Sequence, residues 1–217
     1  QVDPAQQHFD ISQHLLEAGR PTRAWRHLVY SARFALDVNR HRIARQRLQR
    51  ALETIPQGAE VERDESPIAA TERFDARRAF VDACMNLNLL DEAEAELAAL
   101  HADAERDPAR LGWVLLLESE IHLRTGQLGA AAKGFQRALQ SFRSVENDTE
   151  CGRSLRGYGL ALARSGQLRL GLEALQQAEQ LARALDNENL LADVLLARAL
   201  PQFDSGEHAA AMQSLAE

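Results

Sequence analysis

Apolar and polar positions recur with a helical period along the chain, and turn-forming residues interrupt them at regular intervals. Gly126, Gly166 and Gly206 recur at one constant spacing, and each separates two apolar helical stretches. Asn88-Leu89-Leu90 stands almost one such interval before Gly126 and has the same surroundings. A fixed period of about 40 residues is the signature of a repeat array. The pattern therefore predicts pairs of helices that are repeated along the chain.

The positions around each glycine agree from copy to copy. Small residues stand about seven positions before and five after the glycine, and large apolar residues stand about eleven before and nine after it. The aligned residues are Leu115, Leu155 and Leu195; Ser119, Gly159 and Ala199; Ala131, Gly171 and Ala211; Phe135, Leu175 and Leu215; and Ala138 and Ala178. Small residues let two helices approach where they cross, large ones fill the space between hairpins, and glycine ends the first helix. Each repeat is thus predicted to be a helical hairpin.

This pattern resembles the tetratricopeptide repeat over residues 68–217, in roughly three and a half hairpins. The long period is similar to that of the long-helix variant in large bacterial regulators. The resemblance implies an all-α fold of ten or eleven antiparallel helices stacked into a right-handed superhelix, an α-solenoid whose last repeat is truncated. Glu118 and Arg198 depart from the apolar residue expected in the first helix, and Pro201 is expected to kink or break its helix.

The first third of the chain differs from the rest. We expect helices that begin at Asp3-Pro4 and end near Ala18, and then span residues 22–38 and 40–55, before an acidic linker at 56–67 that ends in a helix start at Ser66-Pro67. Residues 9–53 resemble the segment that joins the ATPase core to the repeats in signal-transduction ATPases with numerous domains. That resemblance implies a nucleotide-binding domain upstream, with residues 1–55 joining it to the repeat array as a sensor or docking arm.

Composition and charge support a helical chain and leave its partner open. Ala and Leu fill 70 positions, whereas Val, Ile and Thr fill only 18, which disfavours a β-sheet protein. The net charge of −7 is no general signature of nucleic-acid binding, although residues 20–50 carry nine arginines and one acid. Arg33, Arg40 and Arg47 could form a stripe for phosphate or an acidic partner. The alternatives are a solvated face or docking to a neighbouring domain.

The sequence contains none of the motifs of common catalytic or metal sites. It lacks GxxxxGK[ST], HExxH and GxSxG, so we expect no enzyme activity, no cofactor and no metal. Asp10 and His14 have a spacing that could hold a metal, but a local hydrogen bond is the alternative. Cys84 and Cys151 are expected to be buried thiols, and no apolar run spans a membrane. The chain begins at Gln1, and we expect a piece of a longer, cytoplasmic bacterial protein.

The resemblance places a binding site on the concave wall that the first helices line. The outward positions of those helices are Arg78, Asp82, Trp113, Leu116, Glu120, Arg124, Arg153, Arg156, Arg164, Asp193 and Leu196. Guanidinium groups there could bind a carboxylate-bearing peptide, and Trp113 could anchor an apolar side chain. The alternatives are intramolecular ion pairs and packing between repeats. The Lys/Asn carboxylate clamp of chaperone-binding members is missing, so chaperone binding is not carried over.

We therefore expect a non-catalytic scaffold that captures a protein or peptide partner, as the regulatory arm of a bacterial signalling protein. Its own upstream nucleotide-binding domain is one candidate partner. An allosteric small-molecule sensor domain of a transcriptional regulator is the alternative, and a deep apolar pocket with convergent polar groups would favour it.

Overall fold

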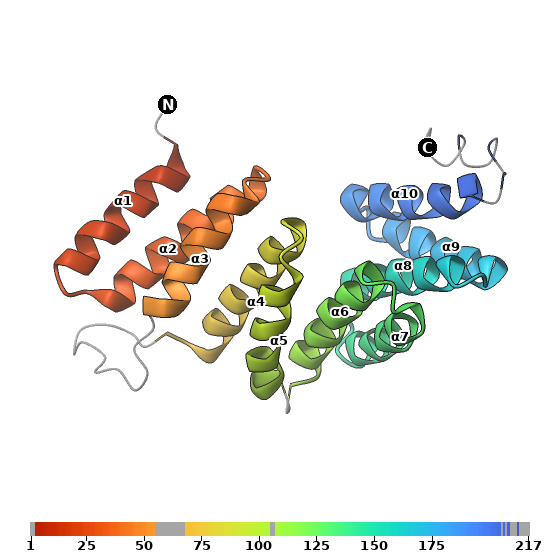
Figure 1. Ribbon diagram of the computed structural model, residues 1–217, viewed down its shortest axis with the longest axis horizontal. Coiled ribbons are helices and arrows are strands. Elements are labelled where there is room, and N and C mark those ends of the chain that lie inside the picture. The colour runs from red at the N-terminus through yellow and green to blue at the C-terminus, as the bar shows by residue number, and fades with distance from the viewer. Residues whose placement is uncertain are drawn as a thin grey trace. The chain divides into compact units, whose positions relative to one another are not determined.

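The computed structural model describes residues 3–54, 68–104 and 107–204, together with 206, 208 and 212. Within these residues the chain forms ten α-helices and no strand, which confirms the all-α prediction. The helices are α1 (Pro4–Glu17), α2 (Pro21–Asp37), α3 (His41–Thr54), α4 (Ala70–Asn86), α5 (Leu90–Ala104), α6 (Pro108–Arg124), α7 (Leu128–Ser144), α8 (Asp148–Arg164), α9 (Leu168–Ala184) and α10 (Glu188–Asp204). Consecutive helices pack as antiparallel pairs (Figure 1).

The chain divides into two compact units, an N-terminal unit of residues 1–100 and a C-terminal unit of residues 101–217. The first holds α1–α4 and most of α5, and the second holds α6–α10. This division differs from the predicted one, which grouped residues 68–100 with the later repeats. Arg26 of α2 lies 3.6 Å from Glu72 of α4, and Arg45 of α3 donates a 2.8 Å hydrogen bond to Glu92 of α5. These ion pairs tie α4 and α5 to the helices before them. The predicted linker at 56–67 and its helix start at Ser66-Pro67 lie outside the described residues.

The turns in the C-terminal unit recur at half the spacing of the glycines. Gly126 and Gly166 have φ values of 79° and 88°, so the turns predicted at these glycines are present and have a left-handed backbone. Glu146 and Asp186, midway between glycines, have φ values of 54° and 51° and make the same kind of turn between hairpins. The backbone N–H after each turn closes it; that of Asn147, for example, donates to the Phe142 carbonyl at 3.0 Å. Each of α6–α10 is 17 residues long, and connections of equal length separate these helices from one another.

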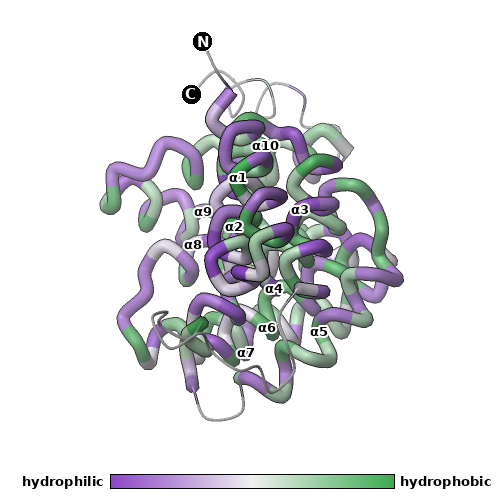
Figure 2. The backbone as a smooth tube through the Cα atoms, turned by 90° about the vertical axis from the view of Figure 1, so that its left-hand side faces the viewer, coloured by the Kyte–Doolittle hydropathy of each residue, from purple (hydrophilic) through white to green (hydrophobic). Residues whose placement is uncertain are grey.

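Glycines and phenylalanines set the packing within and between hairpins. A Cβ atom on Gly159 would lie 2.7 Å from the Gly171 carbonyl oxygen, so the backbones of α8 and α9 touch where they cross. Phe135 is fully buried, and its ring lies against Gly157 of the next hairpin. Hydrophilic and hydrophobic residues are interspersed along the backbone of the helices (Figure 2). These contacts confirm the predicted roles of the small and large positions.

Polar residues at two predicted apolar positions have polar partners on a neighbouring helix. Glu118 lies 3.7 Å from His101, and Arg198 pairs with the buried Glu179 of α9. The expected break at Pro201 does not occur, because α10 continues through this residue to Asp204. Pro201 lies in the last turn of α10, so its missing N–H affects only the end of the helix.

Candidate functional site

The first helices of the C-terminal unit lie side by side, because α8 contacts both α6 and α10. Their outward residues form what we call the first-helix face, which contains Trp113, Glu120 and Arg124 of α6, Arg153, Arg156 and Arg164 of α8, and Asp193 and Leu196 of α10. Most of the residues predicted for the concave wall therefore come from three neighbouring helices. Arg78 and Asp82 belong to α4 in the N-terminal unit and are considered separately.

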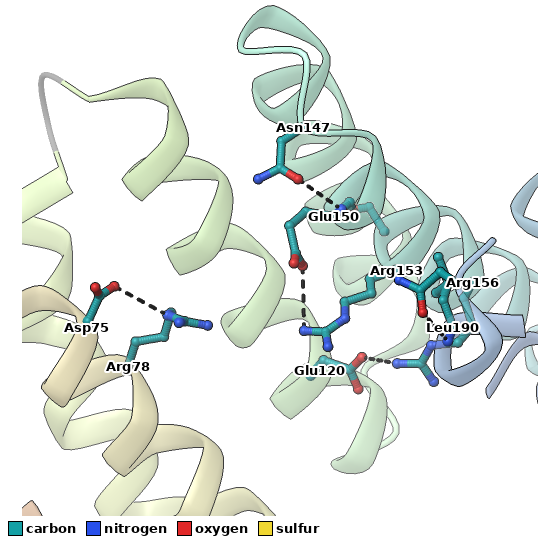
Figure 3. A network of polar contacts seen from close by, with 10 residues as sticks. Asp75, Arg78, Glu120, Asn147, Glu150, Arg153, Arg156 and Leu190 are labelled. Atoms are coloured by element: carbon teal, nitrogen blue, oxygen red, sulfur yellow. Dashed lines mark hydrogen bonds and ion pairs between the residues drawn. The ribbon is translucent and has the colours of Figure 1, made fainter. Parts of the chain in front are cut away.

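Two arginines of the first-helix face have carboxylate partners within the chain (Figure 3). Arg156 donates a 2.7 Å hydrogen bond to Glu120, and their side chains are only 22% and 18% exposed. Arg153 lies 3.6 Å from Glu150 of its own helix. These distances support the alternative of intramolecular ion pairs. The Nε atom of Arg156 is nevertheless buried without a hydrogen-bond partner among the described residues.

The two candidate residues of α4 have a similar character. Arg78 lies 3.9 Å from Asp75, one helical turn earlier. Asp82 is half-buried, and its backbone carbonyl accepts a 2.9 Å hydrogen bond from the Asn86 side chain. Because Arg78 has a local carboxylate partner and Asp82 is half-buried, the two residues make a less accessible site than the sequence predicts.

Leu116 and Trp113 contribute to packing. Leu116 is buried within the core of the C-terminal unit. Its assignment to the concave wall is therefore wrong, because neighbouring side chains cover it and no partner can reach it. Trp113 is half-buried and packs edge-on against Phe142, with ring centroids 5.7 Å apart. This contact lies between α6 and α7 of one hairpin, so Trp113 packs within a repeat and not between repeats as the alternative held.

The remaining residues of the face point to solvent. Arg124, Arg153, Arg164 and Asp193 are exposed, and Arg164 also donates a 3.2 Å hydrogen bond to the Leu123 carbonyl. Charged side chains from all three helices therefore lie on the accessible part of the face.

The α10 helix adds an apolar stripe that sequence reasoning only partly found. Leu196, Leu200 and Phe203 are 53%, 52% and 61% exposed. They stand at i, i+4 and i+7, so they share one side of the helix. The repeat period places Leu200 opposite Leu160 and Glu120 in the alignment, which could have identified it from the sequence.

The basic segment does not form the predicted arginine stripe. Arg47 is buried, donates to the Ser31 carbonyl and lies over the Phe9 ring, 5.0 Å from its centroid. Burial also lowers the pKa of Arg47. Arg40 pairs with Asp3 at 2.8 Å, whereas Arg33 is exposed. Arg40 and Arg47 thus stabilise the contacts of α3 with the start of the chain.

A histidine and aromatic cluster between α1 and α2 was missed. The Nδ1 atoms of His8 and His27 lie 2.8 Å apart, and the His8 ring stacks on Phe34. Tyr30 is a further ring neighbour of His8, and both Tyr30 and Phe34 are exposed. The i, i+4 spacing of the two aromatic residues was the available signal, but it does not show that α1 supplies histidine.

Cys84 and Cys151 are buried free thiols, as predicted, and burial raises the pKa of Cys84 to about 11. Asp10 accepts a hydrogen bond from Gln6, and His14 lies 3.7 Å from Glu17. The described residues include no group of three or more metal-ligating side chains. Among the described helices, none has the length and apolar character to cross a bilayer.

The chain shares its fold with a solved bacterial protein. A crystal structure of aspartyl phosphate phosphatase F from Bacillus subtilis matches it with a TM-score of 0.69 and 12% sequence identity. The match covers 98% of this chain but 58% of that protein, so the chain corresponds to little more than half of its length. No protein-family model and no curated protein matches the sequence. The likeness establishes a tetratricopeptide-like array of helical hairpins.

Proposed function

We propose that the chain is a non-catalytic interaction module that binds a peptide or partner segment on the first-helix face. The observation that carries this proposal is the mixture of exposed groups on α8 and α10. Arg153 and Arg164 of α8 present positive charge, and the neighbouring helix α10 presents the apolar stripe of Leu196, Leu200 and Phe203. Neighbouring apolar anchors and charged side chains are typical of surfaces that recognise protein segments.

The preferred ligand is a segment with an apolar side chain followed by a carboxylate. The apolar side chain would contact Leu196 and Leu200, while the carboxylate would pair with Arg153, which is half-exposed and only loosely held by Glu150. We propose that this module serves as the regulatory arm of a larger bacterial signalling protein; a GxxxxGK[ST] motif in the gene upstream of Gln1 would support the link to an ATPase.

Peptide selection tests the proposal. A random peptide library is selected on the immobilised chain, and the affinity of the best peptide is measured for wild type, Leu196→Ser and Arg153→Gln. We expect each substitution to weaken binding on the order of tenfold, because each removes one anchor of the complex. The matched control is Arg169→Gln on α9, which removes an exposed arginine outside the face and should change affinity less than about twofold.

Two results would overturn this assignment. One is a selection that enriches no peptide, and the other is a peptide whose affinity is the same for wild type and both first-helix variants. Arg153 is preferable to Arg156 for this test, because removing Arg156 would leave the partly buried Glu120 without its partner and destabilise the first-helix face. The small-molecule sensor function stays a prediction that ligand screening can address.

A further inference from the structure

A second polar surface lies on the second helices of the C-terminal unit. Gln136, Gln140 and Arg143 of α7 are exposed and stand at i, i+4 and i+7, so they form one stripe along the helix. The stripe borders a groove of about 520 Å³ whose buried apolar lining includes Leu139 and Leu155. Its other polar lining residues are Arg137, Tyr158 and Gln177.

The same stripe recurs one repeat later, on α9. Gln176, Gln180 and Arg183 line a groove of about 380 Å³. Here the arginines are already neutralised, because Arg183 and Arg198 both pair with Glu179 and Arg169 pairs with Glu173 at 2.6 Å. The carboxylates of Glu173 and Glu179 therefore neutralise the positive charge of the α9 groove.

The α7 groove keeps its positive charge. Among the described residues, no acidic side chain lines it, and neither Arg137 nor Arg143 forms an ion pair with any of them. Position 179, where α9 has the glutamate that pairs with two arginines, corresponds to the apolar Leu139 in α7. Two guanidinium groups without carboxylate partners leave this groove positively charged, although the net charge of the chain is −7.

We propose that the α7 groove binds an extended acidic segment of a partner protein. Arg137 and Arg143 stand at i and i+6, roughly 9 Å apart along the helix axis. Two or three residues of an extended chain span a similar distance at about 3.3 Å each. Two carboxylates with that separation would each meet one guanidinium group, whereas a single small anion would satisfy only one.

The uncharged residues fit the backbone of such a segment. Gln136, Gln140 and Gln177 each carry an amide that both donates and accepts, as does the Tyr158 hydroxyl. An extended peptide exposes backbone N–H and C=O groups that need partners of this kind. The groove is therefore built for an acidic polypeptide more than for an isolated acid. It shares no residue with the first-helix face, so the two proposals stand or fall separately.

Fluorescence anisotropy with labelled hexaglutamate tests the inference on the whole chain at low ionic strength. Hexaglutamine is the matched neutral peptide and should bind far more weakly. The double variant Arg137→Gln, Arg143→Gln should weaken hexaglutamate binding on the order of tenfold or more, since it removes both charge-assisted contacts. The control Arg169→Gln, Arg183→Gln removes the same charge from the α9 groove and should change binding less than about twofold.

The outcomes separate the groove from the overall charge of the chain. Equal losses in the two double variants would mean that only long-range charge matters, and this would overturn the proposal. Binding that survives the α7 substitutions, or hexaglutamate that binds no better than hexaglutamine, would overturn it as well. All four arginines are exposed, and circular dichroism melting curves should show that both variants remain folded. A Tyr158→Phe variant, which keeps the charge, should give a loss smaller than that of the double arginine variant, because it removes only a contact to the peptide backbone.

Discussion

Two glycines at one crossing decide how closely α8 and α9 approach. A Cβ atom on Gly159 would meet the Gly171 carbonyl oxygen at 2.7 Å, and one on Gly171 would meet the Gly159 carbonyl oxygen at 2.6 Å. Both obstacles are backbone atoms, which cannot rotate away as the end of a side chain can. The absence of a side chain at these positions is therefore a requirement of the hairpin.

We expect Gly159→Ala to destabilise the chain by about 1–3 kcal/mol, because the added methyl group overpacks the crossing. Gly129 is the matched control, since it lies in α7 with no atom within 4 Å of its virtual Cβ. Gly129→Ala should be neutral or stabilising by up to about 1 kcal/mol, because alanine favours the helix. Urea denaturation of the two variants measures the difference, and equal effects would contradict the crossing model.

The His8 and His27 pair introduces a dependence on acid. Their Nδ1 atoms share a 2.8 Å contact in which one ring must donate and the other accept. Burial lowers the pKa of His27, and the charge of His8 lowers it further. The folded chain thus favours neutral His27 more than the unfolded chain does.

The stability of the chain should fall as the pH falls below the pKa of about 6.5 that histidine has in the unfolded state. Above the unfolded pKa of about 6.5 both states hold neutral His27, and the full stability is present. Below it the unfolded state takes up the proton first, so stability is lost progressively down to the lower folded pKa. Thermal melting between pH about 7.5 and about 5.5 should show this loss, and His27→Gln should reduce it. His14→Gln, at an exposed position, should leave it unchanged.

At the scale of elements, the turns are alike in shape but differ in the residue that makes them. Gly166 ends α8, whereas Glu146 ends the hairpin before it, with nearly the same left-handed backbone. A residue with a Cβ atom is strained in this conformation by about 1–2 kcal/mol. Asn147 and Asn187 then cap the following helices by accepting backbone N–H groups at 3.3 and 3.0 Å.

Exchanging the residues at two of these turns should have opposite effects. Glu146→Gly should stabilise the chain by up to about 1 kcal/mol, since it removes the strain at the cost of some backbone entropy. Gly166→Ala should destabilise it by about 1 kcal/mol, because a residue with a Cβ atom is strained in the left-handed conformation. No atom lies within 4 Å of the added Cβ, so steric overlap contributes nothing. Melting temperatures of the two variants provide the comparison. A loss of stability in both would show that the side chain of Glu146 matters more than its backbone.

The same elements show what the sequence could and could not predict. Glycine is typical of left-handed turns, so the sequence predicts the turns within hairpins. Glutamate and aspartate are not typical of such turns, so the sequence does not show the turns at Glu146 and Asp186 or the shorter repeating unit of one helix and one turn. Leu116 looked like a wall residue because the helical period does not tell which side a neighbouring helix covers. The Arg156 and Glu120 pair joins residues whose separation falls one helical turn short of the repeat period, and this offset depends on how the hairpins stack.

At the scale of the whole molecule, local patterns predicted the architecture better than the boundary between its parts. The acidic stretch at 56–67 has the composition of a linker, yet Arg26 with Glu72 and Arg45 with Glu92 join helices on either side of it. Composition identifies where a chain is polar, but only side-chain pairs between distant helices show which helices form one unit. The candidate surfaces depend on side-chain pairs of the same kind, because an arginine that pairs with a carboxylate of its own chain is less able to bind a partner.

The equal helix lengths and the regular spacing of the turns have a consequence for how such a chain can change in size. From α6 to α10 every connection has the same length and contains one residue with a left-handed backbone, at regular intervals along the sequence. A duplication or deletion of one whole repeat would therefore rejoin a helix end to a turn that already fits it. A gene of this kind can lengthen or shorten its reading surface by whole hairpins while each remaining interface stays intact. An insertion or deletion of any other length would join a helix to a turn in a register that the present chain does not contain.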